Sequence, residues 1–467
     1  MVNLPRYVAL KSKYNNNYLR YVNEASQVQK FLQYSGESVL TPYTVYELEQ
    51  AKCDPSLVNI RCAYNNKYWV SWPSDHHFIV AQADNIEEDK SKWNCTLFQP
   101  IYDSNNQAFR FRHVYLGFNV CLWRGSAPYV NCLRAQWSSP DRDLCDLSTP
   151  INWGTLLSLP KHIVFKGDNG YYLSAQWIEE HQYLQFASND IGDPTVGMET
   201  FITKDGHIRF KSNYFGKFWR RSPNWIWADS TDTTTNNSDT LFLPTKVDKN
   251  VVALRNMGNN NFIKRLTADG KTSCLNAAVN TIDGTARLQF EESVLSREIY
   301  NVKFRPSDSR IYDQSTLVMA TETATNTTKE SHTMNLKFTY TETKSSMWNS
   351  SVSIKLGVKT TVQTGIPFIV DGKVEISATF SGQYQWGETK TTSKVVETLY
   401  QVTVPSMSTV IVSLLATQGT SDVPYSYTQC DTLINGEIKS YQMDDGVYKG
   451  VNSYNFKYET KSKPITA

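Results

Sequence analysis

Two short stretches of the sequence carry the side chains best suited to binding a sugar. Protein sites hold sugars with a flat aromatic ring against the C–H faces, and with carboxylate, amide or imidazole groups on the hydroxyls. Both stretches supply this mixture within a few residues. The predicted carbohydrate-binding residues are Asp75, His76, His77, Phe78, Asn224, Trp225 and Trp227.

Two other interpretations of these residues stay open. Phe78 and Trp225 could be core residues, because large aromatic side chains are often buried. His76 and His77 beside Asp75 could suggest a metal, but adjacent residues seldom converge on one ion, and no further ligand follows at a suitable spacing. We therefore predict no metal site and no cofactor.

The sequence gives little support to an enzyme. It contains no Gly-x-Ser-x-Gly elbow, P-loop, HExxH or dinucleotide-binding fingerprint. The carboxylate pairs Glu179–Glu180 and Asp444–Asp445 are typical of solvated turns rather than of an acid/base pair. We predict a non-enzymatic protein.

Similar strand–turn–strand segments position the candidate residues. Each segment has an Asn/Gly-rich turn and an aromatic residue on the return strand, and the period is about 45 to 50 residues, which indicates a repeat architecture. The segments begin at Val8, Val58, Phe109, Ile163, Ile208 and Val252. Three units before residue 150 and three after it predict two closed three-fold barrels, each a β-trefoil. Residues 150–155 would connect them.

The remainder of the chain is rich in Thr, Ser and Val, and helical periodicity is nearly absent, so we predict an all-β protein with an elongated last domain. Residues 444–450 are predicted as a turn before the final strand, 453–458. The predicted domains are 1–149, 150–295 and 296–467.

One hairpin in this last domain is predicted to insert into a membrane. From Trp348 to Trp386, apolar and polar residues alternate, which gives each arm one apolar face. Each arm rises about 25 Å, the height of the apolar band of a membrane barrel. The apolar positions are Trp348, Val352, Ile354, Leu356, Val358, Val362, Phe368, Val374, Ile376, Ala378, Phe380, Tyr384 and Trp386.

Pairing Val352 with Tyr384 puts Val362 opposite Val374, with an apolar bend over residues 365–372. One hairpin cannot close a barrel, so several chains must contribute. The alternative is an ordinary amphipathic hairpin packed on a soluble core.

Composition limits the partners and the location. The chain has 467 residues and a formal charge of +2, without a basic stripe, which argues against nucleic acid. The first residues lack an apolar h-region, so we expect no secretory signal and cytoplasmic or nucleocytoplasmic synthesis. The eight cysteines are expected to be reduced.

Specific motifs match a known lectin family. Tyr18-Leu-Arg-Tyr21, Lys92-Trp93-Asn94-Cys95, Lys211-Ser-Asn-Tyr214 and Lys217-Phe-Trp-Arg220 resemble amaranthin-type plant lectins, and this similarity runs from about residue 4 to about residue 291. From about Ile299 onward, Thr/Ser-rich strands around the amphipathic hairpin resemble the pore-forming module of the aerolysin family.

These resemblances imply a function. Amaranthin-type agglutinins bind GalNAc-containing glycans such as the T-antigen disaccharide, at a head-to-tail dimer interface, with a segment that aligns with residues 72–78. The family has Asn, Tyr and Trp where this chain has Asp75, His77 and Phe78, so the exact glycan does not carry over.

We therefore expect a lectin that targets a β-barrel pore-forming toxin module to glycan-bearing membranes, in a homo-oligomeric ring, for plant defence. One alternative is a soluble cytosolic lectin whose C-terminal domain only oligomerises. A weaker one is a trefoil scaffold that binds protein partners.

Overall fold

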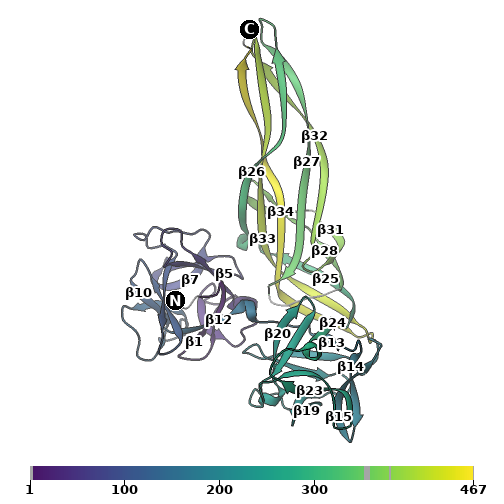
Figure 1. Ribbon diagram of the computed structural model, residues 1–467. Helices are drawn as coiled ribbons and strands as arrows, with labels where there is room; N and C mark the ends of the chain where they lie inside the picture. Colours follow the sequence, from purple (N-terminus) through teal and green to yellow (C-terminus); the bar gives the residue numbers. More distant parts are fainter. Residues whose placement is uncertain (1–3, 352–357, 378–379, 466–467) are drawn as a thin grey trace. The chain divides into compact units, whose positions relative to one another are not determined.

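The computed structural model describes residues 4–351, 358–377 and 380–465 (Figure 1). The described residues form strands and short 3-10 turns, so the chain is all-β as expected. They divide into two compact units. The first contains residues 1–296, 351–358 and 431–439, and the second contains residues 297–350, 359–430 and 440–467.

The first twelve strands make one closed sheet. They are β1 (Tyr7–Ser12), β2 (Tyr18–Tyr21), β3 (Leu32–Gly36), β4 (Tyr46–Gln50), β5 (Val58–Cys62), β6 (Tyr68–Trp72), β7 (Asp75–Ala83), β8 (Leu97–Asp103), β9 (Ala108–His113), β10 (Phe118–Leu122), β11 (Leu133–Trp137) and β12 (Ser148–Asn152). The pairings β1–β4, β4–β5, β5–β8, β8–β9, β9–β12 and β12–β1 close a ring. Hairpins β2–β3, β6–β7 and β10–β11 stand outside it, which is the β-trefoil topology.

The next twelve strands repeat this pattern. They are β13 (His162–Lys166), β14 (Tyr172–Ile178), β15 (His181–Ser188), β16 (Met198–Ile202), β17 (Ile208–Ser212), β18 (Phe218–Ser222), β19 (Trp225–Ser230), β20 (Phe242–Asp248), β21 (Val251–Asn256), β22 (Phe262–Ala268), β23 (Lys271–Val279) and β24 (Leu288–Glu292). The ring is β13–β16–β17–β20–β21–β24, and β24 pairs again with β13. Each trefoil is built from three of the six predicted repeats.

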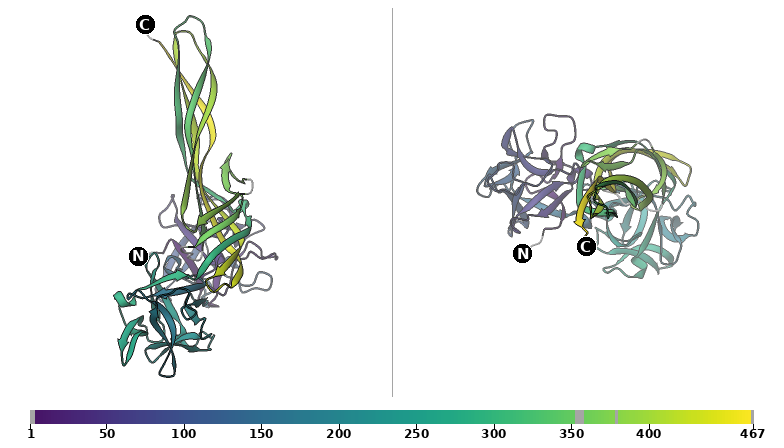
Figure 2. Two further views of the ribbon diagram at one scale, coloured as in Figure 1. Left: turned by 90° about the vertical axis from the view of Figure 1, so that its right-hand side faces the viewer. Right: turned by 90° about the horizontal axis from the view of Figure 1, so that it is seen from above.

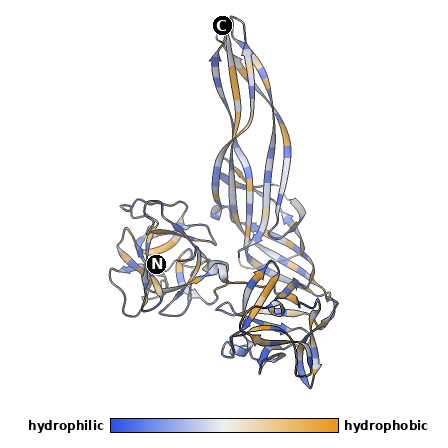
Figure 3. Ribbon diagram, viewed as in Figure 1, coloured by the Kyte–Doolittle hydropathy of each residue, from blue (hydrophilic) through white to orange (hydrophobic). Residues whose placement is uncertain are grey.

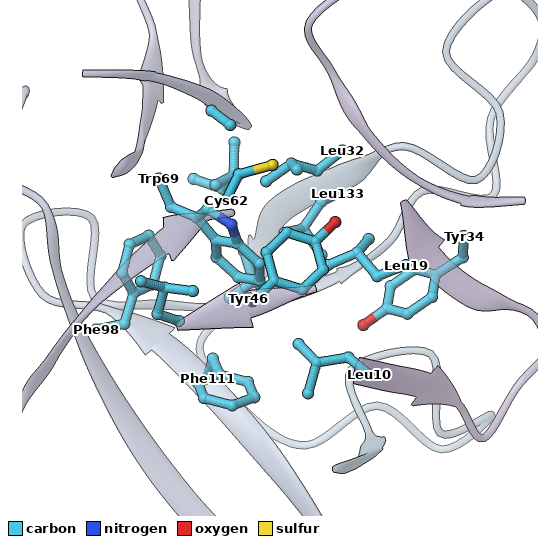
Figure 4. Close-up of a cluster of buried hydrophobic side chains, with 14 of the residues drawn as sticks. Leu10, Leu19, Leu32, Tyr34, Tyr46, Cys62, Trp69, Phe98, Phe111 and Leu133 are labelled. Atoms are coloured by element: carbon cyan, nitrogen blue, oxygen red, sulfur yellow. The ribbon is translucent and has the colours of Figure 1, made fainter. Parts of the chain in front are cut away.

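Apolar residues from all three repeats fill each barrel. In the first trefoil Trp69 lies edge-on to Tyr46 and Phe98, with ring centroids 5.3 and 5.7 Å apart, and Leu10 and Phe111 complete the cluster (Figure 4). Edge-to-face packing suits these rings. The β12 strand continues to Asn152, so the first barrel runs past residue 149, and the connector predicted at 150–155 begins within a strand.

Long strands build the elongated second unit, and they run side by side in both side views (Figures 1 and 2). One sheet contains β25 (Val294–Phe304), β26 (Arg310–Asn326), β27 (His332–Ser350), β28 (Lys359–Thr364), β31 (Phe380–Gln385), β32 (Thr389–Val404), β33 (Ser408–Leu433) and β34 (Ile438–Pro464). The short strands β29 (Pro367–Val370) and β30 (Lys373–Ile376) form a separate two-stranded sheet. The turn predicted at 444–450 is wrong, because these residues lie inside β34. Asp445 is correspondingly buried rather than solvated.

The distal part of this unit has its own core. Ala324, Phe338, Val402 and Val412 are buried there, and apolar segments recur along the long strands among polar ones (Figure 3). Most inward positions on β27 and β32 are even-numbered, as alternation in a strand requires.

Strands β28 to β31, residues 359–385, form a segment that we call the tongue. Tyr384 pairs with Thr360 rather than with Val352, a shift of eight residues from the predicted register. The predicted bend at 365–372 contains the reversal of the chain but is longer than it. It contains β29, and the tight turn is Asp371–Gly372, where both residues have positive φ. Aspartate and glycine tolerate this backbone conformation better than the apolar residues before them.

All eight cysteines lie in the described part of the chain and are free thiols. The described residues contain no helix that is long and apolar enough to cross a lipid bilayer.

Candidate functional site

In the first trefoil the predicted turn becomes the tight connection between β6 and β7. Trp72 pairs with Asp75 across it. The Asp75 carboxylate accepts a hydrogen bond from the backbone N–H of His77 (3.1 Å) and lies 3.5 Å from the Arg134 guanidinium. Asp75, His76 and His77 are half-buried, so their polar groups lie at the surface.

Phe78 has a different position. Its side chain is only 4% exposed and packs with Phe31, Val80 and Cys132. The Arg134 guanidinium covers it, 4.6 Å from the ring centroid. Phe78 therefore offers no ring face to a sugar in this conformation. It is a core residue, which is the alternative left open by the sequence.

Another aromatic residue lies beside the turn. Trp93 is 36% exposed and stacks on His76, with ring centroids 4.5 Å apart and planes 3° apart. The next residue, His77, is oriented differently, because its Nδ1 atom lies 3.1 Å from the carbonyl oxygen of Ala135. His76 and Trp93 together form a flat π surface next to the Asp75 carboxylate.

The second trefoil builds a comparable pair. Trp227 on β19 is half-buried and stacks on exposed His181 of β15, with centroids 4.1 Å apart and planes 10° apart. Trp225 is 8% exposed and packs with Tyr183 and Cys274, so it belongs to the interior.

Polar groups surround this second pair. Asn224 is exposed, and its Oδ1 accepts hydrogen bonds from Asn259 (3.3 Å) and Arg221 (3.4 Å). Arg220 forms two hydrogen bonds with Asp229, at 3.0 and 2.6 Å, and these raise the pKa of the guanidinium. Arg220 also lies 5.8 Å from the Trp227 ring centroid.

The structure thus divides the seven predicted residues. Asp75, His76, His77, Asn224 and Trp227 lie at the surface, whereas Phe78 and Trp225 lie inside. Sequence reasoning missed Trp93 and His181 as ring partners. Trp93 belongs to the Lys92-Trp93-Asn94-Cys95 motif, but only the folding of the loop after β7 brings it onto His76. In the described part of the chain no three His, Cys, Asp or Glu side chains are placed to hold a metal.

Most described residues of the predicted membrane hairpin are buried or half-buried in the fold. Trp348, Val362 and Trp386 are buried with Tyr425, Tyr427 and Tyr448, and Val374 packs against this cluster. Val358 is buried with Val294 and Leu433, Phe368 is half-buried, and Ile376 is 38% exposed. The remaining positions lie outside the described residues (Val352, Ile354, Leu356 and Ala378) or have undescribed side chains (Phe380 and Tyr384).

Comparison with known proteins identifies the lectin part. A family model described as the agglutinin domain matches residues 2–148 and again residues 157–292, which together are more than half of the chain. The chain belongs to the agglutinin family. The first match covers β1 to β11 and ends at the first residue of β12, the second covers β13 to β24, and together they contain all seven predicted sugar-binding residues. No curated protein sequence matches this agglutinin.

Several solved structures are similar to the agglutinin. A lamprey immune protein shares 13% identity over 66% of this chain and 91% of its own, with a TM-score of 0.33. An aerolysin-like protein of Bombina maxima shares 10% identity over 36% of this chain and 99% of its own (TM-score 0.25). The BEL β-trefoil shares 14% identity over 32% and 96% (TM-score 0.26). The likeness at this level is one of β architecture only.

Proposed function

We propose that this agglutinin is a carbohydrate-targeted pore-forming protein without enzymatic activity. Its trefoils bind Gal- or GalNAc-containing glycans on a membrane, and the tongue of each protomer then contributes one hairpin to a shared barrel. The trefoil part rests on the family membership and on the exposed His–Trp pairs. The pore-forming part rests on the register of one strand pair.

That strand pair is β27 and β32. It runs antiparallel from His332 opposite Val404 to Met347 opposite Thr389. Continued residue by residue in the same register, it brings Val352 opposite Tyr384 and Val362 opposite Val374. This is the pairing that matches apolar with apolar along both arms. In the structure the tongue has a different register, with Thr360 opposite Tyr384.

The extended hairpin would also have suitable boundaries. Its apolar band begins beyond Trp348 and Trp386, and aromatic residues favour the membrane interface. Before that band, β27 and β32 carry Glu342, Lys344 and Lys390 at even-numbered positions, which suit water. Closure of a barrel satisfies the backbone hydrogen bonds in lipid, and this requires several protomers.

Release of the tongue would break few strand pairings with the rest of the unit. The tongue pairs with the rest of the unit through β25 and β28, over Arg297–Thr360 to Ile299–Val362. Asn452 holds its tip, because its side chain accepts a hydrogen bond from the Ile369 N–H and donates one to the Ile369 carbonyl, both at 2.9 Å.

Dye leakage from vesicles tests this function. Vesicles that carry a GalNAc-terminated glycolipid should leak, free GalNAc should inhibit, and vesicles without glycolipid should stay intact. We expect an affinity between millimolar and micromolar, about 4 to 8 kcal/mol per site. A glycan array in which no galacto-configured glycan binds would exclude Gal- or GalNAc-containing glycans as the ligand.

A cysteine pair separates targeting from insertion. Ile299→Cys with Val362→Cys joins partners on β25 and β28. The oxidised variant should bind glycan normally and fail to leak, and leakage should return on reduction. Leakage in the oxidised state would mean that the tongue does not need to leave its sheet.

A soluble lectin whose elongated unit only oligomerises is the second candidate. Burial of Trp348 and Trp386 favours it, because in this state the hairpin behaves as an ordinary packed segment. Agglutination without leakage would support it. For either function we place synthesis in the cytoplasm and a defensive action, such as plant defence, after release.

A further inference from the structure

The most exposed tryptophan among the described residues lies outside both candidate sugar sites. Trp177 is the last but one residue of β14, and its side chain is 62% exposed. Strands β14 and β15 form one of the three hairpins outside the closed ring of the second trefoil (Figure 1). A single exposed ring is common on protein surfaces, so its neighbours decide whether it marks a site.

Aromatic neighbours hold the Trp177 ring in place. Phe215, in the turn between β17 and β18, meets it edge-on, with ring centroids 5.5 Å apart and planes 79° apart. Phe215 also packs against the core of the second trefoil, and exposed Tyr214 packs on Phe215 with centroids 5.2 Å apart. A ring that is fixed in this way loses little freedom on binding, so its open face is a preorganised surface for C–H groups.

An amide lies on the same face of the hairpin as the ring. Gln182 on β15 is the direct cross-strand partner of Trp177, and such partners point to the same side of a sheet. The Gln182 side chain is half-buried and forms no hydrogen bond within the part of the chain that the structure describes. Its donor and its acceptor are therefore both available to a ligand on the ring.

Two carboxylates form the turn that joins these strands. Glu179 and Glu180 both have positive φ (48° and 63°), where Asn, Asp or Gly is usual in a two-residue turn. Glu179 Oε2 lies 2.6 Å from Lys271 Nζ, and Glu180 is exposed. Carboxylates repel the anionic head groups of a membrane surface, so this turn favours an uncharged, hydroxyl-bearing ligand over lipid.

The hairpin separates this surface from the His181–Trp227 pair. Ile178 follows Trp177 in the strand and packs in the cluster that contains Trp227. Successive residues of a strand point to opposite faces, so Trp177 and Trp227 lie on different sides of the hairpin. A ligand on Trp177 is therefore additional to a ligand on Trp227.

We propose that the end of the β14–β15 hairpin is a further sugar-binding site. A neutral hexose lays its C–H face on the Trp177 ring, and the Gln182 amide and the Glu180 carboxylate bind its hydroxyls. Two sites on one trefoil let a single chain hold two residues of a clustered glycan, which raises the apparent affinity. The choice of Gal or GalNAc as that hexose rests on the proposed function, whereas the site itself does not.

Fluorine NMR of the full chain labelled with 5-fluorotryptophan tests the site, because the signal of Trp177 can be followed separately. Its loss in Trp177→Phe assigns it among the 12 tryptophans. Titration with the methyl glycosides of GalNAc, galactose, glucose and mannose should shift this signal in a saturable way for at least one sugar. Gln182→Ala should weaken that binding about threefold or more, through loss of a hydrogen bond.

Trp137→Ala is the matched control, because Trp137 is an exposed tryptophan at the end of β11 in the other trefoil. It should leave the Trp177 titration unchanged, and circular dichroism checks the fold of each variant. A Trp177 signal that no sugar moves would overturn the site, and so would an unchanged affinity in Gln182→Ala. A signal that moves only with vesicles free of glycolipid would identify a lipid surface and also overturn it.

The other tryptophan signals separate this site from the proposed function. If GalNAc or galactose moves Trp93 and Trp227 but no sugar moves Trp177, the further site fails and the proposed lectin stands. If only Trp177 responds, the further site stands and the two His–Trp pairs are not glycan sites. If Trp177 responds to glucose or mannose alone, the site stands and the assigned Gal or GalNAc ligand fails there.

Discussion

At the scale of single residues, Phe78 and Trp93 have opposite roles that their types alone do not reveal. Phe78 lies in the predicted sugar-binding turn but faces the interior, where Arg134 covers it. Trp93 lies on the loop between β7 and β8 and stacks on His76 at the surface. A lectin site needs an accessible ring, so the flat surface of His76 and Trp93 is the better partner for a sugar.

Substitutions should separate these two roles. Trp93→Ala and His77→Ala should weaken glycan binding, because they remove an aromatic face and a polar contact, and Tm should change little. Phe78→Ala should instead destabilise the first trefoil by about 3–5 kcal/mol, as expected for a large cavity in a core. Scanning calorimetry measures Tm, and an assay on immobilised glycan measures binding. If Phe78→Ala abolishes binding at unchanged Tm, the assignment of the ring to the core is wrong.

His113 should make the first trefoil sensitive to acid. It is fully buried, its Nδ1 accepts a hydrogen bond from the Leu116 N–H (3.3 Å), and its Nε2 lies 3.2 Å from Ser71 Oγ. Burial lowers its pKa to about 4 from the ordinary 6.5. The unfolded chain therefore binds the proton first, and stability falls as pH drops from about 6.5 towards 4.

The loss should reach about 3 kcal/mol at the lower end of that range. Burial also lowers the pKa of His162 and His207 in the second trefoil, so the whole-chain profile contains their contributions. Chemical denaturation of wild type and His113→Gln at several pH values isolates the effect. Equal pH dependence in the two proteins would exclude His113 as its source.

At the scale of elements, the tongue pairs in one register while the strands that flank it define another. Ile369 is buried and held by Asn452, and Val362 is buried in an aromatic cluster, so tertiary contacts outweigh the better apolar matching of the extended hairpin. Two pairings of one sequence are possible here because both keep alternate residues on one face.

Added charges on the tongue should reveal which face meets lipid. Ile376→Lys places a charge on the predicted lipid face and should reduce leakage, because a lysine facing lipid costs about 2–4 kcal/mol per protomer at the bilayer midplane and less near an interface. Glu375→Lys, on the opposite face, is the matched control and should leak almost normally. Both side chains are exposed in this structure, so both variants should fold. Leakage that falls equally in the two variants would contradict the alternation.

We prefer Glu375 to Ser377 for the polar-face control. The Ser377 hydroxyl accepts a hydrogen bond from the Ile366 N–H at 2.8 Å, so a lysine there would disturb the folded tongue as well.

At the scale of the whole molecule, the proposed oligomeric pore should prefer anions. Its predicted lumen face carries Lys355, Lys359 and Lys373 against Glu375, with Asp371 near the tip. Repeated around a ring, the excess of positive charge favours anion conduction. Reversal potentials in planar bilayers under a salt gradient measure this. A clear cation preference would mean that the lumen face or the hairpin is misassigned.

The sequence by itself determined the large divisions of this protein. Six hairpin repeats with period-two strands and Asn/Gly turns specify two trefoils, because each unit closes locally and must bury its aromatic residues against the other two. The alternation from Trp348 to Trp386 likewise predicted an amphipathic hairpin, which we propose leaves the soluble fold.

Tertiary structure decided which side chains are accessible and which register the tongue adopts. Phe78 and Trp93 are both aromatic residues near the same turn, and only the packing of β7 against its neighbours distinguishes them. Asp445 lies in an acidic Asp-Asp-Gly run that is typical of a turn, yet its carboxylate accepts a hydrogen bond from Tyr427 at 3.1 Å inside a long strand. Such choices depend on partners far away in the chain, and alternation and composition do not record those partners.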